Sequence, residues 1–544
     1  YIIFTITLLL TGLYACEDDF LDTSPPDKLT EDKVFNDEKL LRSHMLSNYL
    51  YIPQQFLNWG FLLDENTLDV NPQNGINPHT THDFSASNSP YSGKWNLYNP
   101  IRSINLFIEN MDKSELKDLK DLYLAEARLL RAVYYSELFY FFRGVPIITV
   151  PQSINDKESW LVPRNSADEV FNFIVSELEA SAPVLPKEWE EANDHGRATS
   201  GAAYGLLARV LLYQACLKND NDLYTKAAEA AKRVMDQGIY ELFTLDQDIF
   251  LTKYDQGNRE HILYFDKILT YAWQGWDVFG DWSFGNVPES KGGGAFDFPT
   301  QNLVDAFEMI DGQSIDESPL YDPQNPYENR DPRLSAFIYH QGDDFNGVPL
   351  EMWIDSDGNP GAEHKSAEAE QTGYFIKKAI IETYEDYYEL TWAGGKTEYY
   401  DPYLRFADIL LMYAEAKNQV SGPTSEVYEA VNRVRARAGI ADLPAGLSKE
   451  QMFERIKNER RVEFCFEGRR FHDVRRWGIA TEDGICGGNV YRMHIVKDAV
   501  TGELTYTKEV MNTRPQMTEK YVLAPIPQDD IDKNARLLPN NPGY

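Results

Sequence analysis

The chain has 544 residues and carries 86 acidic against 52 basic side chains, which gives a formal net charge of −34 at pH 7. A field of this sign repels nucleic-acid phosphates and anionic lipid head groups, so we expect no nucleic-acid partner. Hydrophobic residues make up 43% of the chain and charged residues 25%, values that are ordinary for a globular protein and that exclude both a disordered chain and a membrane-embedded helix bundle.

Residues 1–15 form an uncharged, apolar segment that is shorter than the roughly 20 residues of a membrane-spanning helix. The segment is typical of a signal peptide, although neither a Met nor a basic stretch precedes it, and we expect the open reading frame to begin further upstream. Cys16 follows Tyr14 and Ala15 in a pattern that resembles a bacterial lipobox, with Tyr14 bulkier than usual. We therefore predict lipidation of Cys16 as a membrane anchor, with a simple secretory signal beside an incidental cysteine as the alternative.

Helical periodicity is strong in the first half of the chain. Apolar side chains recur with helical spacing over residues 123–142, before a Gly-Val-Pro stretch ends the pattern. Ser166 and Glu169 have the spacing of a capping box at the start of the next predicted helix. Two further helices are predicted over residues 202–215 and 224–235, joined by a short polar turn. Small Ala residues on one helix face Leu and Tyr on the other, which allows the two helices to approach closely. This helical hairpin resembles a tetratricopeptide unit, although no tandem 34-residue period is present.

A second helical block starts near residue 403 and continues with a helix over residues 427–438. Ser448 and Gln451 have the spacing of a capping box for a third helix, which we expect to run to about Gly468.

Between the two blocks, over about residues 240–401, the periodicity fades and Gly, Pro, Asn, Asp and aromatic residues take over. We therefore predict a mainly α fold in a single domain over residues 16–544. A tetratricopeptide-like helical scaffold occupies about 16–239 and 402–544, and a large loop-rich insert over about 240–401 carries the ligand-binding groups.

No sequence pattern selects a catalytic or metal site. Cys216, Cys465 and Cys486 lack a zinc-ligand spacing, and we interpret them as structural thiols. His79 and His82 have a spacing that suits a metal, but no further ligand cluster accompanies them. Nothing singles out one of the many carboxylate pairs that a glycosidase could use. We therefore predict no enzyme activity, no metal and no cofactor.

Nine short motifs follow one another in a fixed order along nearly the whole chain. They occupy residues 16–22, 95–101, 131–132 with 144–146, 299–307, 329–334, 405–411, 458–461 with 466–478, 525–527, and 541–544. This order of motifs resembles the SusD/RagB family of Bacteroidetes.

The resemblance implies a surface lipoprotein that captures nutrients, usually oligosaccharides, and delivers them to a SusC-type TonB-dependent transporter, over which it sits as a lid. It also implies an all-helical core of tetratricopeptide-like hairpins. The acidic residues 17–19 directly after Cys16 resemble the signal that sends such lipoproteins to the outer face of the outer membrane. The resemblance therefore places the protein on the extracellular side of that membrane, held by its lipid anchor.

Aromatic residues make up 13% of the chain, and they are densest over residues 271–284. In this stretch Tyr271, Trp273, Trp276 and Trp282 alternate with Asp, Gln and Gly, and neither helix nor strand periodicity explains the pattern. Indole faces can cover the apolar C–H faces of a sugar, while carboxylates and amides bond to its hydroxyl groups. We predict that these residues bind a glycan, with a satellite hydrophobic core as the alternative.

Two smaller aromatic groups are further candidates for glycan binding. Trp95 and Tyr98 lie three residues apart at a predicted helix start, which in the SusD/RagB family often faces the ligand. Trp59 with Asp64 combines an aromatic face and a carboxylate. Core packing is the alternative for the Trp95 pair.

Eight basic side chains over residues 455–476 could form a phosphate site, but acidic residues alternate with them at spacings of three and four. We interpret this segment as a structural ion-pair network. The predicted function is therefore the capture of oligosaccharides without chemical change. Two alternatives stay open: a peptide-binding nutrient captor similar to the RagB branch, and a surface glycosidase.

Overall fold

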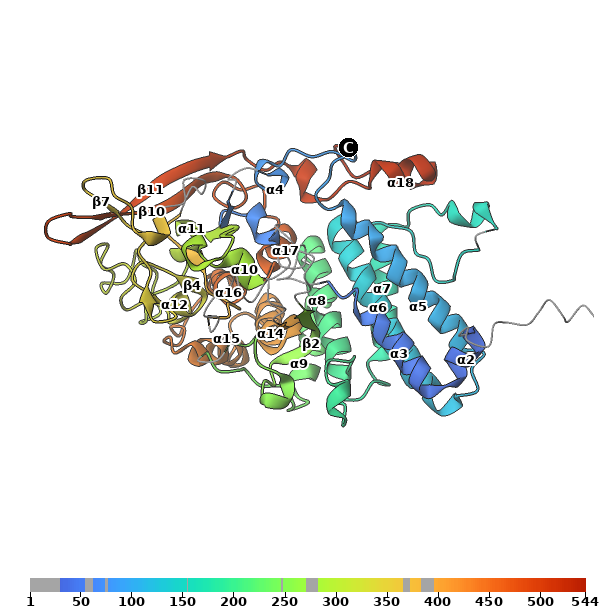
Figure 1. The fold of residues 1–544 in the computed structure, drawn as a ribbon. Helices are drawn as coiled ribbons and strands as arrows, with labels where there is room; N and C mark the ends of the chain where they lie inside the picture. The colour runs from blue at the N-terminus through green and yellow to red at the C-terminus, as the bar shows by residue number, and fades with distance from the viewer. Residues whose placement is uncertain are drawn as a thin grey trace, which may run out of the picture.

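The structure is a computed structural model that describes residues 30–53, 62–73, 77–153, 155–245, 248–270, 282–364, 372–382 and 396–544. It is mainly α, as predicted, and its long helices lie in the two blocks that the periodicity indicated (Figure 1). No helix in these ranges has both the length and the apolar character needed to cross a membrane.

The first block consists of antiparallel helices that pack side by side at one end of the molecule (Figure 1). The helix predicted over residues 123–142 ends at Phe142, and Arg143 follows with a positive φ of 64°. Ser166 and Glu169 form the predicted capping box. The helices are α2 (Glu31–Asn36), α3 (Glu38–Tyr49), α5 (Tyr98–Met111), α6 (Lys117–Phe142), α7 (Ala167–Ser181), α8 (Ser200–Lys218) and α9 (Asn221–Met235). The one-turn helix α4 (Pro78–Thr81) lies apart from them and contacts the 3₁₀ turn Leu63–Asn66.

Helices α8 and α9 form the predicted hairpin, with Thr199 capping the first helix and Asp220 the second. Helix α8 approaches the second block closely at Gly205, where a Cβ atom would lie 2.4 Å from Leu404 Cδ2 and 2.8 Å from Ile409 Cδ1. A glycine is therefore needed for α8 to pack against the start of the second block.

The second block contains α14 (Phe406–Ser421), α15 (Ser425–Ala438), α16 (Lys449–Glu463) and α17 (Arg469–Arg476). Ser448 and Gln451 form the predicted capping box of α16. This helix ends at Glu463, earlier than the predicted end near Gly468, because Phe466 and Gly468 both adopt positive φ and turn the chain into α17.

The segment between the blocks contains short strands and helices rather than loops alone. The longest strands, β2 (His261–Thr270) and β9 (Lys396–Arg405), pair antiparallel. Strand β1 (Val70–Pro72) pairs with β3 (Asp297–Pro299), which ties the amino-terminal part of the chain to this segment. The other elements are α10 (Trp282–Asn286), α11 (Gln301–Val304), α12 (Arg333–Phe337), β4 (Ile338–Tyr339), β5 (Asp344–Phe345), β6 (Val348–Pro349), β7 (Ile354–Asp355) and β8 (Phe375–Ile376).

The carboxyl-terminal part of the chain contributes a strand hairpin at one end of the molecule and a short helix at the other (Figure 1). Strands β10 (Gly488–Lys497) and β11 (Leu504–Arg514) form a long hairpin that the sequence analysis did not predict, and it extends at the end opposite α5 (Figure 1). Helix α18 (Gln528–Lys533) lies beside the first block, and the Asn541 side-chain amide donates a hydrogen bond to the Phe142 carbonyl oxygen.

Among the described residues, two large hydrophobic cores and three small clusters support this arrangement. The larger core joins the helices of both blocks, from Phe35 to Ala524. The smaller one lies around Phe298, Tyr339 and Phe375 in the segment between the blocks and also takes in side chains of β10.

Candidate functional site

An open groove of about 440 Å³ runs along the start of α5. Its lining comes from three parts of the chain, within residues 95–102, 146–162 and 530–537. We call this cavity the α5 groove.

Local structure brings two of the predicted aromatic residues to the α5 groove. A 3₁₀ turn over Ser92–Leu97 carries Trp95 and leads directly into α5, whose first residue is Tyr98. Pro100 is tolerated there because the first turn of a helix does not need its missing N–H group. The two ring centroids lie 5.2 Å apart with an angle of 59° between the planes.

Both side chains are partly buried, so each has an anchored part and an accessible part. Trp95 packs edge-on against Phe142, with ring centroids 5.2 Å apart. The Tyr98 hydroxyl donates to the Pro146 carbonyl oxygen at 2.8 Å, and burial raises the pKa of Tyr98 well above its ordinary value. The rings are therefore held in fixed positions before any ligand arrives.

Trp160 supplies a third aromatic ring that the sequence analysis missed. It ends a short 3₁₀ turn, Lys157–Trp160, and its side chain is 42% exposed. Its indole Nε1–H donates to the Ser153 carbonyl oxygen at 2.8 Å, which orients the ring. A single Trp in a polar stretch has no periodic pattern around it, so the sequence gives no sign that Trp160 lies in the groove. Only the tertiary structure shows that it lines the same cavity as Trp95 and Tyr98.

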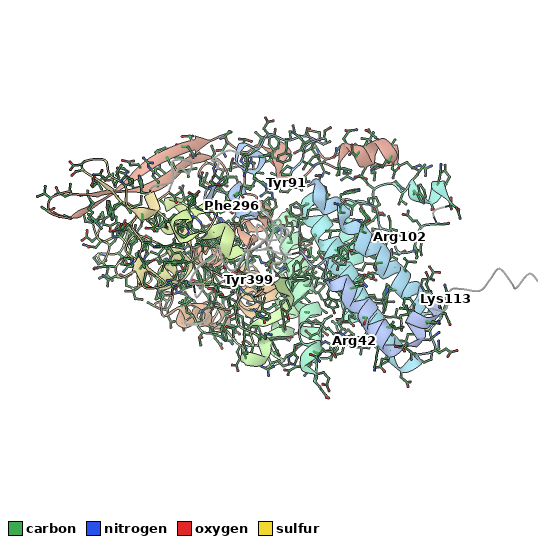
Figure 2. All side chains as sticks on the ribbon, viewed as in Figure 1. Arg42, Tyr91, Arg102, Lys113, Phe296 and Tyr399 are labelled. Atoms are coloured by element: carbon green, nitrogen blue, oxygen red, sulfur yellow. The ribbon has the colours of Figure 1, made fainter. Side chains whose placement is uncertain are left out.

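Polar side chains surround the three rings. Asn96 and Asn99 are exposed at the start of α5, and Arg102 lies on the exposed side of the same helix, where its Nη1 donates to the Gln152 carbonyl oxygen at 2.7 Å (Figure 2). On the opposite wall, the Asn534 side-chain amide donates to the Val162 carbonyl oxygen at 2.8 Å.

This combination suits an uncharged, hydroxyl-rich ligand. The aromatic faces can cover apolar C–H surface, and amide groups can donate to and accept from hydroxyls at the same time. The charged side chains of the wall, Asp530 and Lys533, lie 3.8 Å apart and balance each other. Arg102 therefore leaves the lining with one net positive charge, on an exposed side chain that already donates to the Gln152 carbonyl oxygen, and the rings and amides make up most of the remaining wall.

The structure corrects two of the predicted site residues. Trp282 is only 5% exposed and belongs to the smaller hydrophobic core, where its Nε1–H donates to the Lys378 carbonyl oxygen at 2.8 Å. Asp64 is 1% exposed and accepts a hydrogen bond from the Gly468 backbone N–H at 3.2 Å. Burial raises the pKa of Asp64 to about 7. Neither side chain is accessible to a glycan.

The remaining predicted residues lie outside the residues that the structure describes. They are Cys16, Trp59, Tyr271, Trp273 and Trp276.

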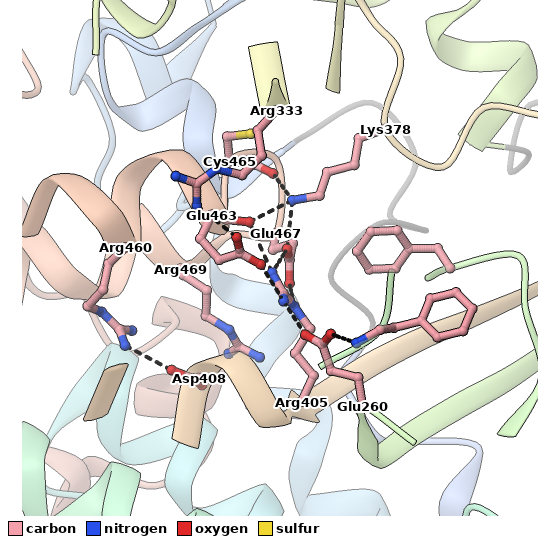
Figure 3. A network of polar contacts seen from close by, with 12 residues as sticks. Glu260, Arg333, Lys378, Arg405, Asp408, Arg460, Glu463, Cys465, Glu467 and Arg469 are labelled. Atoms are coloured by element: carbon pink, nitrogen blue, oxygen red, sulfur yellow. Dashed lines mark hydrogen bonds and ion pairs between the residues drawn. The ribbon is translucent and has the colours of Figure 1, made fainter. Parts of the chain in front are cut away.

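The basic segment over residues 455–476 forms the predicted ion-pair network. Arg460 lies 2.8 Å from Asp473 and 2.9 Å from Asp408. The network extends to Arg405, which is buried between Glu260, Glu463 and Glu467 (Figure 3). Most of the guanidinium groups in the segment pair with carboxylates, the exceptions among the described contacts being Arg469 and Arg475, so the segment is mainly structural.

The three remaining cysteines are free, as predicted, and lie in or near the cores. Burial raises the pKa of Cys216 and Cys465 to about 12 and that of Cys486 to about 11, which makes the thiols unreactive at neutral pH. Within the described ranges, no group of three or more His, Cys, Asp or Glu side chains is arranged to hold a metal ion.

Comparison with known proteins identifies the family of this fold. The model of the SusD family matches residues 260–544, and a second family model, described as "Starch-binding associating with outer membrane", matches residues 19–212. A SusD-like protein of Bacteroides ovatus is 26% identical over 96% of this chain and 94% of its own length.

Solved structures agree with these matches. The crystal structure of a SusD-like protein from Bacteroides fragilis has a TM-score of 0.78 and 26% identity, and covers 96% of this chain and 100% of that one. A SusD-like carbohydrate binding protein from the same species has the same fold, with a TM-score of 0.75 and 23% identity over 93% of this chain and 99% of that one. The helical hairpins, the ordered motifs and the matched family models lead to one conclusion: the chain belongs to the SusD family.

Proposed function

We propose that this protein captures oligosaccharides at the cell surface and that the α5 groove is the binding site. The observation that carries the proposal is the set of three rings, Trp95, Tyr98 and Trp160, which are held by hydrogen bonds or ring contacts around a 440 Å³ groove with amides on its rim. The carbohydrate-binding description of one structural neighbour and the starch-binding description of the second family model support the same ligand class.

The expected affinity is modest. Each aromatic contact contributes on the order of 1 kcal/mol and each net hydrogen bond about the same, and association costs offset much of that sum. This leaves a dissociation constant of roughly micromolar to millimolar. Reversible binding of this strength suits a captor that must pass its ligand on.

Delivery to a SusC-type TonB-dependent transporter and anchoring in the outer membrane through a lipid on Cys16 complete the proposal. The description of the second family model, which names association with the outer membrane, supports the location. Mass spectrometry of the native protein tests the anchor, because an unmodified Cys16 contradicts it. Co-purification from detergent-solubilised membranes tests the transporter partner.

Isothermal titration against a panel of soluble oligosaccharides and peptides tests the ligand class. We expect Trp160→Ala to weaken glycan binding about fivefold or more, because it removes an exposed ring worth about 1 kcal/mol without opening a core cavity. Trp95→Ala should weaken binding at least as much. Tyr51→Ala is the matched control, since Tyr51 is 51% exposed and lies outside the groove.

The possible failures are distinguishable. Wild-type protein that binds only peptides rejects the glycan class. Glycan binding that survives both Trp substitutions rejects the α5 groove as the site, and Trp273 and Trp276 then become the next candidates.

A further inference from the structure

A small cavity of about 30 Å³ lies where α6, α8, α14, α16 and α17 meet. Most of the side chains around it are buried, including Tyr140, Arg469 and His472. The volume is close to that of one water molecule in the liquid, so the cavity can hold a single small ligand.

Several buried polar atoms in the lining of this cavity have no hydrogen-bond partner among the described residues, and all of them can act as donors. They are Nε and Nη1 of Arg209, the Tyr140 hydroxyl and Nδ1 of His472. Tyr140 and His472 are 3% and 9% exposed, so water outside the molecule does not satisfy them. An unsatisfied buried donor costs about 1–3 kcal/mol, and four such atoms in the lining of one cavity indicate a ligand that accepts hydrogen bonds.

The charges of the lining favour an anion. Four guanidinium groups line the cavity, against two carboxylates, Glu137 and Asp473. Both carboxylates are already engaged, Asp473 with Arg460 and Arg476 at 2.8 Å each, and Glu137 with Lys94 at 3.2 Å.

Arg469 is the cation that remains without a carboxylate. It is 7% exposed, and among the described residues no carboxylate lies within 4 Å of its guanidinium group. Its Nη2 donates to the Tyr403 carbonyl oxygen instead. Asp408 lies near it but pairs with Arg209 at 2.6 Å and with Arg460 at 2.9 Å (Figure 3). A buried charge is costly unless it is paired, so this position favours the binding of a counter-ion.

We propose that this cavity binds a small monovalent anion of the size of chloride, which accepts hydrogen bonds from the free donors and neutralises Arg469. Its place between α6 and α8 of the first block and α14, α16 and α17 of the second makes it a structural ion that joins the two blocks. Larger anions such as sulfate or gluconate do not fit a cavity of this volume.

Thermal unfolding of the full chain tests the proposal. Protein freed of halide is melted in sodium chloride, sodium bromide and sodium gluconate at equal ionic strength. We expect chloride and bromide to raise the melting temperature above the gluconate value with a saturable concentration dependence. A halide concentration of about 100 times the dissociation constant shifts the folding equilibrium by about 100-fold.

Arg469→Met should abolish the halide-specific increase and leave the dependence on ionic strength unchanged. Arg233→Met is the matched control, because Arg233 is exposed and does not belong to the cavity lining, and it should keep the full halide effect.

Crystals of wild-type protein grown in bromide give a second readout that does not depend on any variant folding. An anomalous peak in the cavity supports the proposal. Equal melting temperatures in halide and gluconate, or a cavity that contains only water in the bromide crystals, overturns it.

Discussion

Glu463 is a buried carboxylate that pairs with three arginines of the ion-pair network at once. It is 1% exposed and pairs with Arg405 at 2.7 Å, with Arg333 at 3.0 Å and with Arg437. These arginines hold the pKa of Glu463 well below its ordinary value despite its burial. Glu463→Gln keeps the volume of the side chain, so it removes the charge without creating a cavity.

The expected loss in the free energy of unfolding depends on the arginine charges that Glu463→Gln leaves without a partner. Removing one partner of a buried ion pair costs about 3–5 kcal/mol, because the other charge stays buried and uncompensated. Glu260 and Glu467 still compensate Arg405, so we expect a loss within this range rather than the sum over three pairs. An unfolding entropy of about 2.1 cal/mol/K per residue gives about 1 kcal/mol/K for a chain of this length. Dividing the loss of stability by this entropy gives a fall of roughly 3–5 °C in melting temperature.

Differential scanning calorimetry of wild type and variant at pH 7 measures this fall. A carboxylate whose pKa is depressed in the folded state stabilises the protein above its unfolded pKa and loses that contribution as the pH falls. The difference between wild type and Glu463→Gln should therefore be constant above about pH 4.5 and shrink below it.

Glu509→Gln is the matched control. Glu509 pairs with Arg492 at 3.1 Å on the surface, where both side chains are more than one third exposed, and such pairs contribute about 0–1 kcal/mol. A loss below about 1 kcal/mol in Glu463→Gln, similar to that of the control, would refute the reasoning that the buried ion-pair network stabilises the folded protein.

Two further predictions test the corrected site and the pH dependence. Trp282→Ala should lower the free energy of unfolding by about 3–5 kcal/mol, because it leaves a cavity in the smaller core and removes the indole donor of the Lys378 carbonyl oxygen. The glycan affinity of the folded protein should not change. Weakened binding at unchanged stability would contradict the burial of Trp282 in the core. Asp297 and Glu65 form an interacting pair of buried carboxyl groups. Burial raises the pKa of Asp297 to about 7 and that of Glu65 well above its ordinary value, so the folded state keeps protons that the unfolded chain releases, and stability falls as the pH rises from about 4 to 7. Asp297→Asn should therefore lose less melting temperature between pH 5 and pH 8 than wild type, and equal losses would show that Asp297 does not titrate in this range.

Local signals in the sequence predicted the helices well. A capping box requires only two suitable residues three positions apart, so the helix starts after Ser166 and Ser448 could be predicted from the sequence alone. The end of α16 was wrong by a few residues, because the positive φ of Phe466 depends on how the turn packs between α16 and α17.

The candidate site depended on contacts that a local pattern does not contain. Trp95 and Tyr98 were predicted from their spacing and from the family resemblance, but the wall formed by residues 530–537 and the ring of Trp160 come from distant parts of the chain. Trp282 looked like its aromatic neighbours in sequence, and only the packing of α10 against the smaller core shows that it is buried.

The wall formed by α18 has a consequence for how the groove behaves. Ile531 of α18, together with Ile526 before the helix and Leu537 after it, forms a small cluster that packs on Trp95 and is separate from the large core. Segments with few buried contacts open at a lower free energy than the molecule as a whole. We therefore expect mild denaturant or moderate heating to detach this wall first, so that ligand capture fails while the helical body is still folded.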